Sequence, residues 1–170
     1  MRTTQTKKLT VSAMMTAVGV VLLLLASMLP GMQLASAAVA GAAAAIVVVR
    51  GGTGYGLLTV AATALLAWLI VPAKGLVLLY TAFFGPYALV KNRIERLHRL
   101  PLEWALKLLF CAAAAVLLFR FSEQVLELVP EQLAAHLWLF LPAVLAAFAA
   151  YDIVFSKLIA YFADRLHLDR

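Results

Sequence analysis

Residues 9–29 read LTVSAMMTAVGVVLLLLASML, a run without a charged side chain that is followed by Pro30 and Gly31. A helix needs roughly 20 mainly apolar residues to cross the hydrocarbon core of a bilayer. This run therefore predicts a membrane-spanning helix. The segment before it carries Arg2, Lys7 and Lys8, which predicts that the helix begins on the inner side of the membrane.

The composition of the whole chain agrees with this prediction. Of its 170 residues, 65% are hydrophobic and 13% are charged, and the mean hydropathy is +1.00. Soluble domains are about 45–50% apolar and about 25% charged, and a small globule needs a polar surface. The composition thus argues against a soluble enzyme, a nucleic-acid-binding domain and a disordered tail, and we expect an integral protein of the lipid bilayer.

Five more apolar runs follow the first, separated by short loops that contain glycine, proline or basic residues. Together they predict an all-α, polytopic membrane protein, a bundle of six transmembrane helices in one integral membrane domain, residues 1–170. The chain is too short to hold a soluble domain as well. The expected spans are residues 9–29, 34–49, 55–71, 76–90, 102–119 and 137–162.

The basic residues predict the orientation of this bundle. With the N-terminus inside and six spans, twelve of the 14 lysines and arginines fall on the inner side. Only Lys74 and Arg120 fall outside. Inner loops of membrane proteins are enriched in lysine and arginine, so we expect both termini inside, and an odd number of spans would spoil the asymmetry.

Two segments between the spans are amphipathic. Residues 91–100 combine apolar residues at three-residue spacing with four basic residues, and are interpreted either as an inner loop or as a docking site for a partner. Residues 122–133 favour a helix that lies on the outer surface.

Asp152 is the charged residue that most needs an explanation, because it falls within the sixth span. A central aspartate costs roughly 2.5–3.5 kcal/mol on insertion scales, so we expect it to be paired or to face a cavity. Lys157 and Lys107 lie on the same side of the membrane and are the expected partners. A structural ion pair, a proton or cation relay and a contact with a partner protein all remain open.

The sequence offers little for catalysis. His98, His136 and His167 are scattered and give no metal-ligand spacing. The glycine-rich residues 51–56 lack the Lys-Ser/Thr pair that would hold nucleotide phosphates. We therefore predict a protein that is not an enzyme, with no metal and no cofactor.

Polar and aromatic residues gather instead at the expected outer ends of the spans. Such groups at the mouth of an apolar bundle are typical of a small-molecule pocket, and Lys74 suits a ligand carboxylate. Interfacial snorkelling of the same side chains is the alternative. The candidate ligand-binding residues are Gln33, Lys74, Tyr80, Arg120 and Trp138.

Small residues at four-residue spacing, Ala13 and Ala17, follow Lys7 and Lys8 in the opening stretch KKLTVSAMMTA. Such spacing lets helices approach closely in lipid. With six short spans and both ends inside, this opening resembles the substrate-binding (S) component of energy-coupling factor (ECF) transporters. The resemblance covers the whole chain in architecture, but it is specific only in the opening stretch.

The resemblance implies that Ala13 and Ala17 dock against a transmembrane coupling subunit. It also implies that the chain captures a small, vitamin-like nutrient at the outer face of the bacterial plasma membrane. Two cytoplasmic ATPase subunits would then supply the energy. The alternative is a non-transporting membrane scaffold of the MreD-like cell-shape type, which would bind partners through its helices and its inner basic segment.

Overall fold

The apolar runs form helices, as their length and composition predict. The computed structural model describes residues 2–29, 31–94, 100–119, 145–157 and 161, and the regular structure of these ranges is entirely helical. In chain order the elements are α1 (Arg2–Met28), α2 (Gln33–Gly51), α3 (Thr53–Ile70), α4 (Lys74–Leu79), the π-helical turn η1 (Tyr80–Phe84), α5 (Gly85–Ile94), α6 (Leu100–Phe119) and a helix over residues 145–157.

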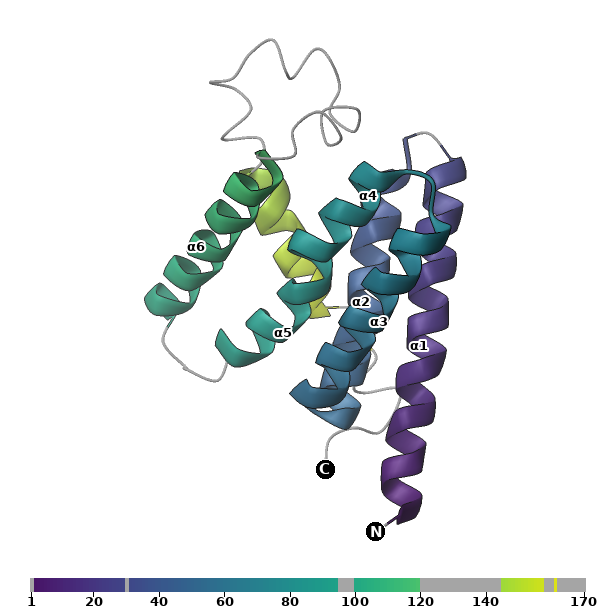
Figure 1. Cartoon of the computed structure of the whole chain (residues 1–170). Coiled ribbons are helices and arrows are strands. Elements are labelled where there is room, and N and C mark those ends of the chain that lie inside the picture. Colours follow the sequence, from purple (N-terminus) through teal and green to yellow (C-terminus); the bar gives the residue numbers. More distant parts are fainter. Residues whose placement is uncertain (1, 30, 95–99, 120–144, 158–160, 162–170) are drawn as a thin grey trace.

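α4, η1 and α5 follow one another without a break and form one helix over residues 74–94. Successive helices then alternate in direction across the bundle (Figure 1). α1 begins at one end of the bundle, and helix 145–157 runs towards that same end. The π turn lies within the fourth of these helices, residues 74–94. The connections are short because Gly31 and Gly52 adopt positive φ angles of 88° and 94°, which glycine tolerates without strain.

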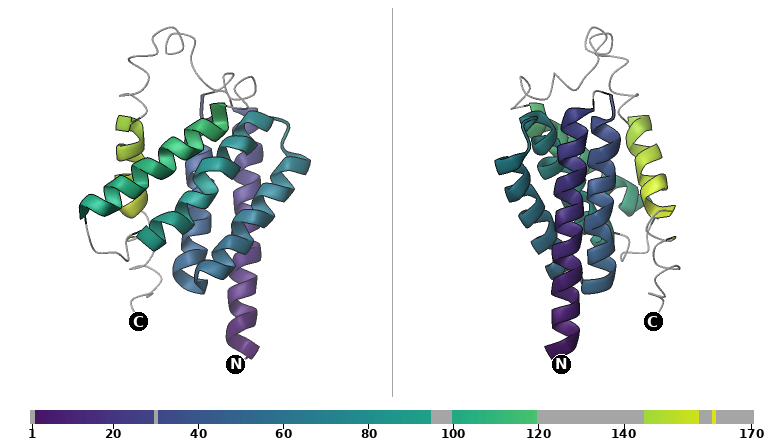
Figure 2. Two further views of the ribbon diagram at one scale, coloured as in Figure 1. Left: turned by 60° about the vertical axis from the view of Figure 1, so that its left-hand side comes forward. Right: turned by 90° about the vertical axis from the view of Figure 1, so that its right-hand side faces the viewer.

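The alanine-rich helix α2 lies among α1, α3 and the 74–94 helix (Figure 2). Half of the residues in the most apolar 18-residue stretch of α2 are buried, compared with 33% in the corresponding stretch of α1 and 17% in that of α6. Small side chains allow this close packing. A Cβ atom built on Gly41 would lie 2.7 Å from the backbone oxygen of Phe84 in η1.

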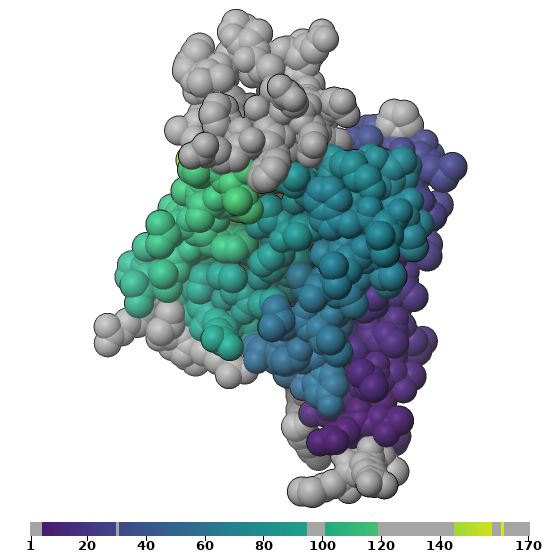
Figure 3. Space-filling view, in the orientation of Figure 1, coloured from purple at the N-terminus to yellow at the C-terminus, as the bar shows by residue number. Residues whose placement is uncertain are grey.

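The outer surface of the helices is apolar, as lipid contact requires. Leu25 and Leu58 are about half exposed, and Leu69 is 81% exposed. Within the described ranges, four helices are long and apolar enough to cross a membrane: Gln5–Met28, Gln33–Gly51, Thr53–Ile70 and Pro101–Leu118. In the space-filling view, α1, α3 and the 74–94 helix form a continuous surface, with α6 on the opposite flank (Figure 3).

The observed helices follow the predicted spans closely at their described ends. The main differences are that α1 begins at Arg2 rather than near residue 9, and that the fourth helix extends to Ile94. Of the predicted sixth span, residues 145–157 and 161 are described. The expected surface helix over residues 122–133 lies outside the described residues, as do residues 95–99 of the segment over residues 91–100.

Candidate functional site

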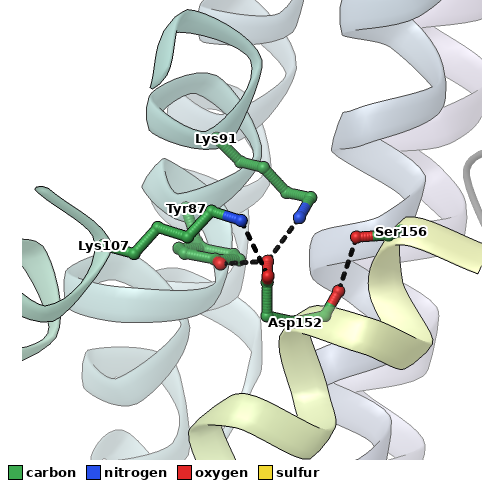
Figure 4. Close-up of polar contacts among 5 residues, drawn as sticks. All are labelled: Tyr87, Lys91, Lys107, Asp152 and Ser156. Atoms are coloured by element: carbon green, nitrogen blue, oxygen red, sulfur yellow. Dashed lines mark hydrogen bonds and ion pairs between the residues drawn. The ribbon is translucent and has the colours of Figure 1, made fainter. Parts of the chain in front are cut away.

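Among the described residues, the buried charged groups gather around the carboxylate of Asp152, on helix 145–157. Tyr87 Oη donates a hydrogen bond of 2.5 Å to Oδ1, and Lys91 forms an ion pair with the same oxygen. Lys107 Nζ lies 2.7 Å from Oδ2. Figure 4 shows the three donors converging on this one carboxylate. We call these four residues the Asp152 network.

Each residue of the Asp152 network is placed by ordinary helix geometry. Tyr87 and Lys91 stand four residues apart on α5, so they share one face of that helix. Lys107 comes from α6, and Ser156 donates a 2.7 Å hydrogen bond to the backbone oxygen of Asp152 one turn back along its own helix. The network therefore joins three helices.

The charges of the Asp152 network are withdrawn from solvent. Lys91 is 1% exposed, Lys107 5% and Asp152 4%. Breaking a buried ion pair by removing one partner typically costs about 3–5 kcal/mol, because the other charge stays buried. Both carboxylate oxygens already accept hydrogen bonds from donors of neighbouring helices, an arrangement suited to fixing the positions of the helices.

Of the two partners predicted for Asp152, Lys107 is confirmed as a contact and Lys157 is not. Lys157 is exposed and is absent from the contacts of the carboxylate. Sequence reasoning missed Lys91, which it had assigned to the surface segment over residues 91–100. The four-residue spacing between Tyr87 and Lys91 was the signal that could have found it.

The candidate ligand-binding residues divide into three groups. Gln33 begins α2 and Lys74 begins α4, so both lie at the end of the bundle opposite the start of α1. Tyr80 is fully buried in the hydrophobic core. Arg120 and Trp138 lie outside the described residues.

Lys74 has partners within its own chain. Its Nζ donates to the backbone oxygens of Trp68, at 2.5 Å, and Val71, at 3.0 Å, and it lies 5.8 Å from the centre of the Trp68 ring. The last carbonyl groups of a helix lack partners within the helix and attract cations. Lys74 therefore caps the C-terminal end of α3.

Three buried hydroxyl groups are the second set of polar groups in the interior, and the sequence analysis had selected only one of them. The hydroxyl oxygens of Thr63, Tyr80 and Tyr151 are buried and have no hydrogen-bond partner within the described part of the chain. Leaving a buried hydroxyl unpaired costs about 1–3 kcal/mol. Tyr80 was a predicted site residue, whereas Thr63 looks in sequence like any other threonine of an apolar span.

The two alanines at the start of α1 lie on its outer face. Ala13 and Ala17 are exposed, whereas Ser12 and Thr16 are buried against the bundle. Ser12 Oγ lies 2.8 Å from Thr59 Oγ1 of α3, so a hydrogen bond fixes the rotation of α1.

Among the described residues, no group of three or more His, Cys, Asp and Glu side chains is placed to hold a metal ion. Comparisons of the chain with protein-family models, with curated proteins and with solved structures found no match.

Proposed function

We propose that this chain is the membrane-embedded substrate-binding subunit of an ECF-type importer, which captures a small, vitamin-like nutrient at the outer face of the bacterial plasma membrane. The observation that carries the proposal is the outward face of α1. Ala13 and Ala17 are exposed there, at the four-residue spacing that the resemblance assigns to docking.

The rotation of α1 supports a docking role for this face. Ser12 Oγ donates to the backbone oxygen of Tyr55 at 3.2 Å and pairs with Thr59 Oγ1, which holds the polar side of α1 against α3. The small side chains of Ala13 and Ala17 are left outside. Helix association in lipid depends on close packing, and small residues let a neighbouring backbone approach. A coupling subunit would bind along this exposed face of α1.

The proposed topology has six spans with both termini inside. The alternating directions of the helices and the four long apolar helices support it. In this orientation Gln33 and Lys74 lie at the outer end, where we propose that the nutrient enters. Arg120 and Trp138 would complete the entrance. Energy would come from two cytoplasmic ATPase subunits, which act through the coupling subunit.

The test is co-purification with the coupling subunit and ATPases encoded in the same genome. Replacing Ala13 and Ala17 with tryptophan adds large side chains to the exposed face of α1 and leaves its buried face unchanged. We expect at least tenfold less coupling subunit to co-purify with the double variant than with the wild type, while the yield of the chain itself is unchanged.

A matched control is available on α6, where Ala112 and Ala113 are also exposed. Tryptophan at these two positions adds the same bulk to a different lipid-facing surface and should leave the complex intact. If the A13W/A17W chain still co-purified with the coupling subunit, the proposal would be wrong.

The second candidate is a non-transporting scaffold of the MreD-like type. The observation that favours it is the capping role of Lys74, whose Nζ already has two backbone acceptors and is less suited to a ligand. A scaffold would bind its partners through the helices and the basic segment over residues 91–99, of which Lys91 itself is buried in the Asp152 network. Co-purification of peptidoglycan-synthesis proteins in place of a coupling subunit would support this alternative.

A further inference from the structure

Three hydroxyl groups from three separate helical segments lie within the apolar interior. They belong to Thr63 on α3, Tyr80 at the start of η1 and Tyr151 on helix 145–157. Thr63 and Tyr80 are 0% exposed, and the hydroxyl oxygen of Tyr151 is also buried. Within the described residues, none of the three has a hydrogen-bond partner.

Tyr80 lies close to each of the other two residues. The Thr63 and Tyr80 hydroxyls are close enough to interact, although their geometry is not that of a hydrogen bond. The Tyr151 hydroxyl is within electrostatic reach of Tyr80, and both side chains pack in the same hydrophobic cluster. Buried hydroxyls nearly always have partners in proteins, so a group of three without one calls for an occupant.

The backbone at this place is also unusual. The π turn begins at Tyr80, and single π turns within α-helices are rare and frequently mark functional sites. Aromatic rings surround Tyr151. Its ring lies 5.2 Å from that of Phe84, in a T-shaped arrangement, and 5.2 Å from that of Phe155. The surroundings of Tyr151 are therefore aromatic as well as apolar.

We propose that the hydroxyls of Thr63, Tyr80 and Tyr151 bind one uncharged polar group of the nutrient, such as an amide, a ring carbonyl or a hydroxyl. The inference rests on the proposed function for the nature of the occupant. A hydroxyl both donates and accepts, so the three can satisfy either kind of uncharged group.

The surroundings argue against an ionised group at this position. A charge in an apolar interior needs a counter-ion, and a hydroxyl does not supply one. The nearest charged residue in sequence is Asp152, next to Tyr151, and its carboxylate is engaged by the two lysines and Tyr87. The substrate class is therefore a molecule that inserts an uncharged, hydrogen-bonding edge.

The first experiment uses the sign of a stability change and needs no known ligand. Y80F and Y151F remove one hydroxyl each with almost no change of shape. If the hydroxyls are bound by an occupant, each variant should unfold about 2–4 °C below the wild type. Unfolding is followed by thiol-reactive fluorescence at Cys111, the one cysteine of the chain, which is buried.

Y55F is the matched control, because Tyr55 lies in the first turn of α3, about two turns before Thr63, and is only half-buried. It should leave the melting temperature unchanged. If Y80F and Y151F left the melting temperature unchanged or raised it, the hydroxyls would have no occupant in the protein, and the inference would be overturned.

The second experiment identifies the occupant. Small molecules extracted from the purified wild-type chain and from the T63V/Y80F variant are compared by mass spectrometry. We expect an uncharged compound with a hydrogen-bonding edge to be depleted at least tenfold in the variant and retained in Y55F. If no compound differed although the melting temperature fell, water would be the occupant and the substrate inference would be wrong.

Both readouts are made on the isolated chain. A failure of the coupling-subunit test therefore leaves them unaffected, and the two proposals can fail separately. An ionised compound that is depleted in T63V/Y80F would contradict the assigned substrate class.

Discussion

Asp152 was identified from sequence because a charge within an apolar span must be paired, yet only part of its surroundings could be predicted. Lys107 is a partner and Lys157 is not. Five residues along a helix correspond to a rotation of roughly 140° from the starting face, which turns Lys157 away from the carboxylate. Lys91 was missed because its basic neighbours indicate a surface loop, whereas α5 continues to Ile94 and carries Lys91 inside.

The substitution D152N tests the Asp152 network. It keeps the size of the side chain but removes the negative charge that Lys91 and Lys107 both contact, so we expect a loss of about 3–5 kcal/mol in the free energy of unfolding. Titration with SDS, followed at Cys111, measures this loss. K157Q is the control and should have little effect, because Lys157 is exposed.

A triple variant separates the charge from the packing. D152L/K91M/K107M replaces the whole ion group by apolar side chains of similar size, and should recover most of the stability that D152N loses. Equal losses in D152N and K157Q would show that the network contributes nothing to stability.

At the scale of elements, the sequence predicts where helices lie better than how they pack. Gly85 and Pro86 disfavour a regular helix within the fourth span, yet the structure has a continuous helix there, with a π turn just before this pair. Proline lacks the backbone N–H that the preceding turn would use, and a local change of helix type is one way to absorb this loss. Whether the helix breaks or continues through a π turn depends on its packing against neighbouring helices, which the local sequence does not reveal.

The packing of α2 against η1 gives a prediction at this scale. In G41A the new Cβ would meet the backbone oxygen of Phe84 at 2.7 Å, and a backbone atom cannot rotate away. We expect G41A to lower the free energy of unfolding by about 1–3 kcal/mol. G54A is the matched control, since nothing lies within 4 Å of its Cβ position. A G41A chain as stable as G54A would contradict the close approach of the two elements.

For the whole molecule, composition and run length were sufficient to predict a helical membrane protein. The described residues confirm the helical fold, and their four long apolar helices suggest a membrane protein. The number of spans and their orientation stay predictions, because they depend on the loops and on the membrane rather than on the helices themselves. The function stays a proposal for a related reason, since a ligand is chosen by a few side chains that no periodic pattern marks.

The predicted orientation can be checked by thiol labelling in intact cells, on a C111A background. Ala35 is exposed in the first turn of α2 and Gly54 in the first turn of α3, and these two helices begin at opposite ends of the bundle. If both termini are inside, A35C should react with a membrane-impermeant maleimide and G54C should react only after the cells are opened. The reverse pattern would overturn the proposed topology.

The order of the residues in the Asp152 network has a consequence for biogenesis. Lys91 and Lys107 are synthesised 61 and 45 residues before the aspartate that both contact. A nascent chain that has reached only residue 119 therefore brings two ammonium groups towards the lipid without this carboxylate. We therefore expect α6 to be held stably in the bilayer only after helix 145–157 has supplied the aspartate.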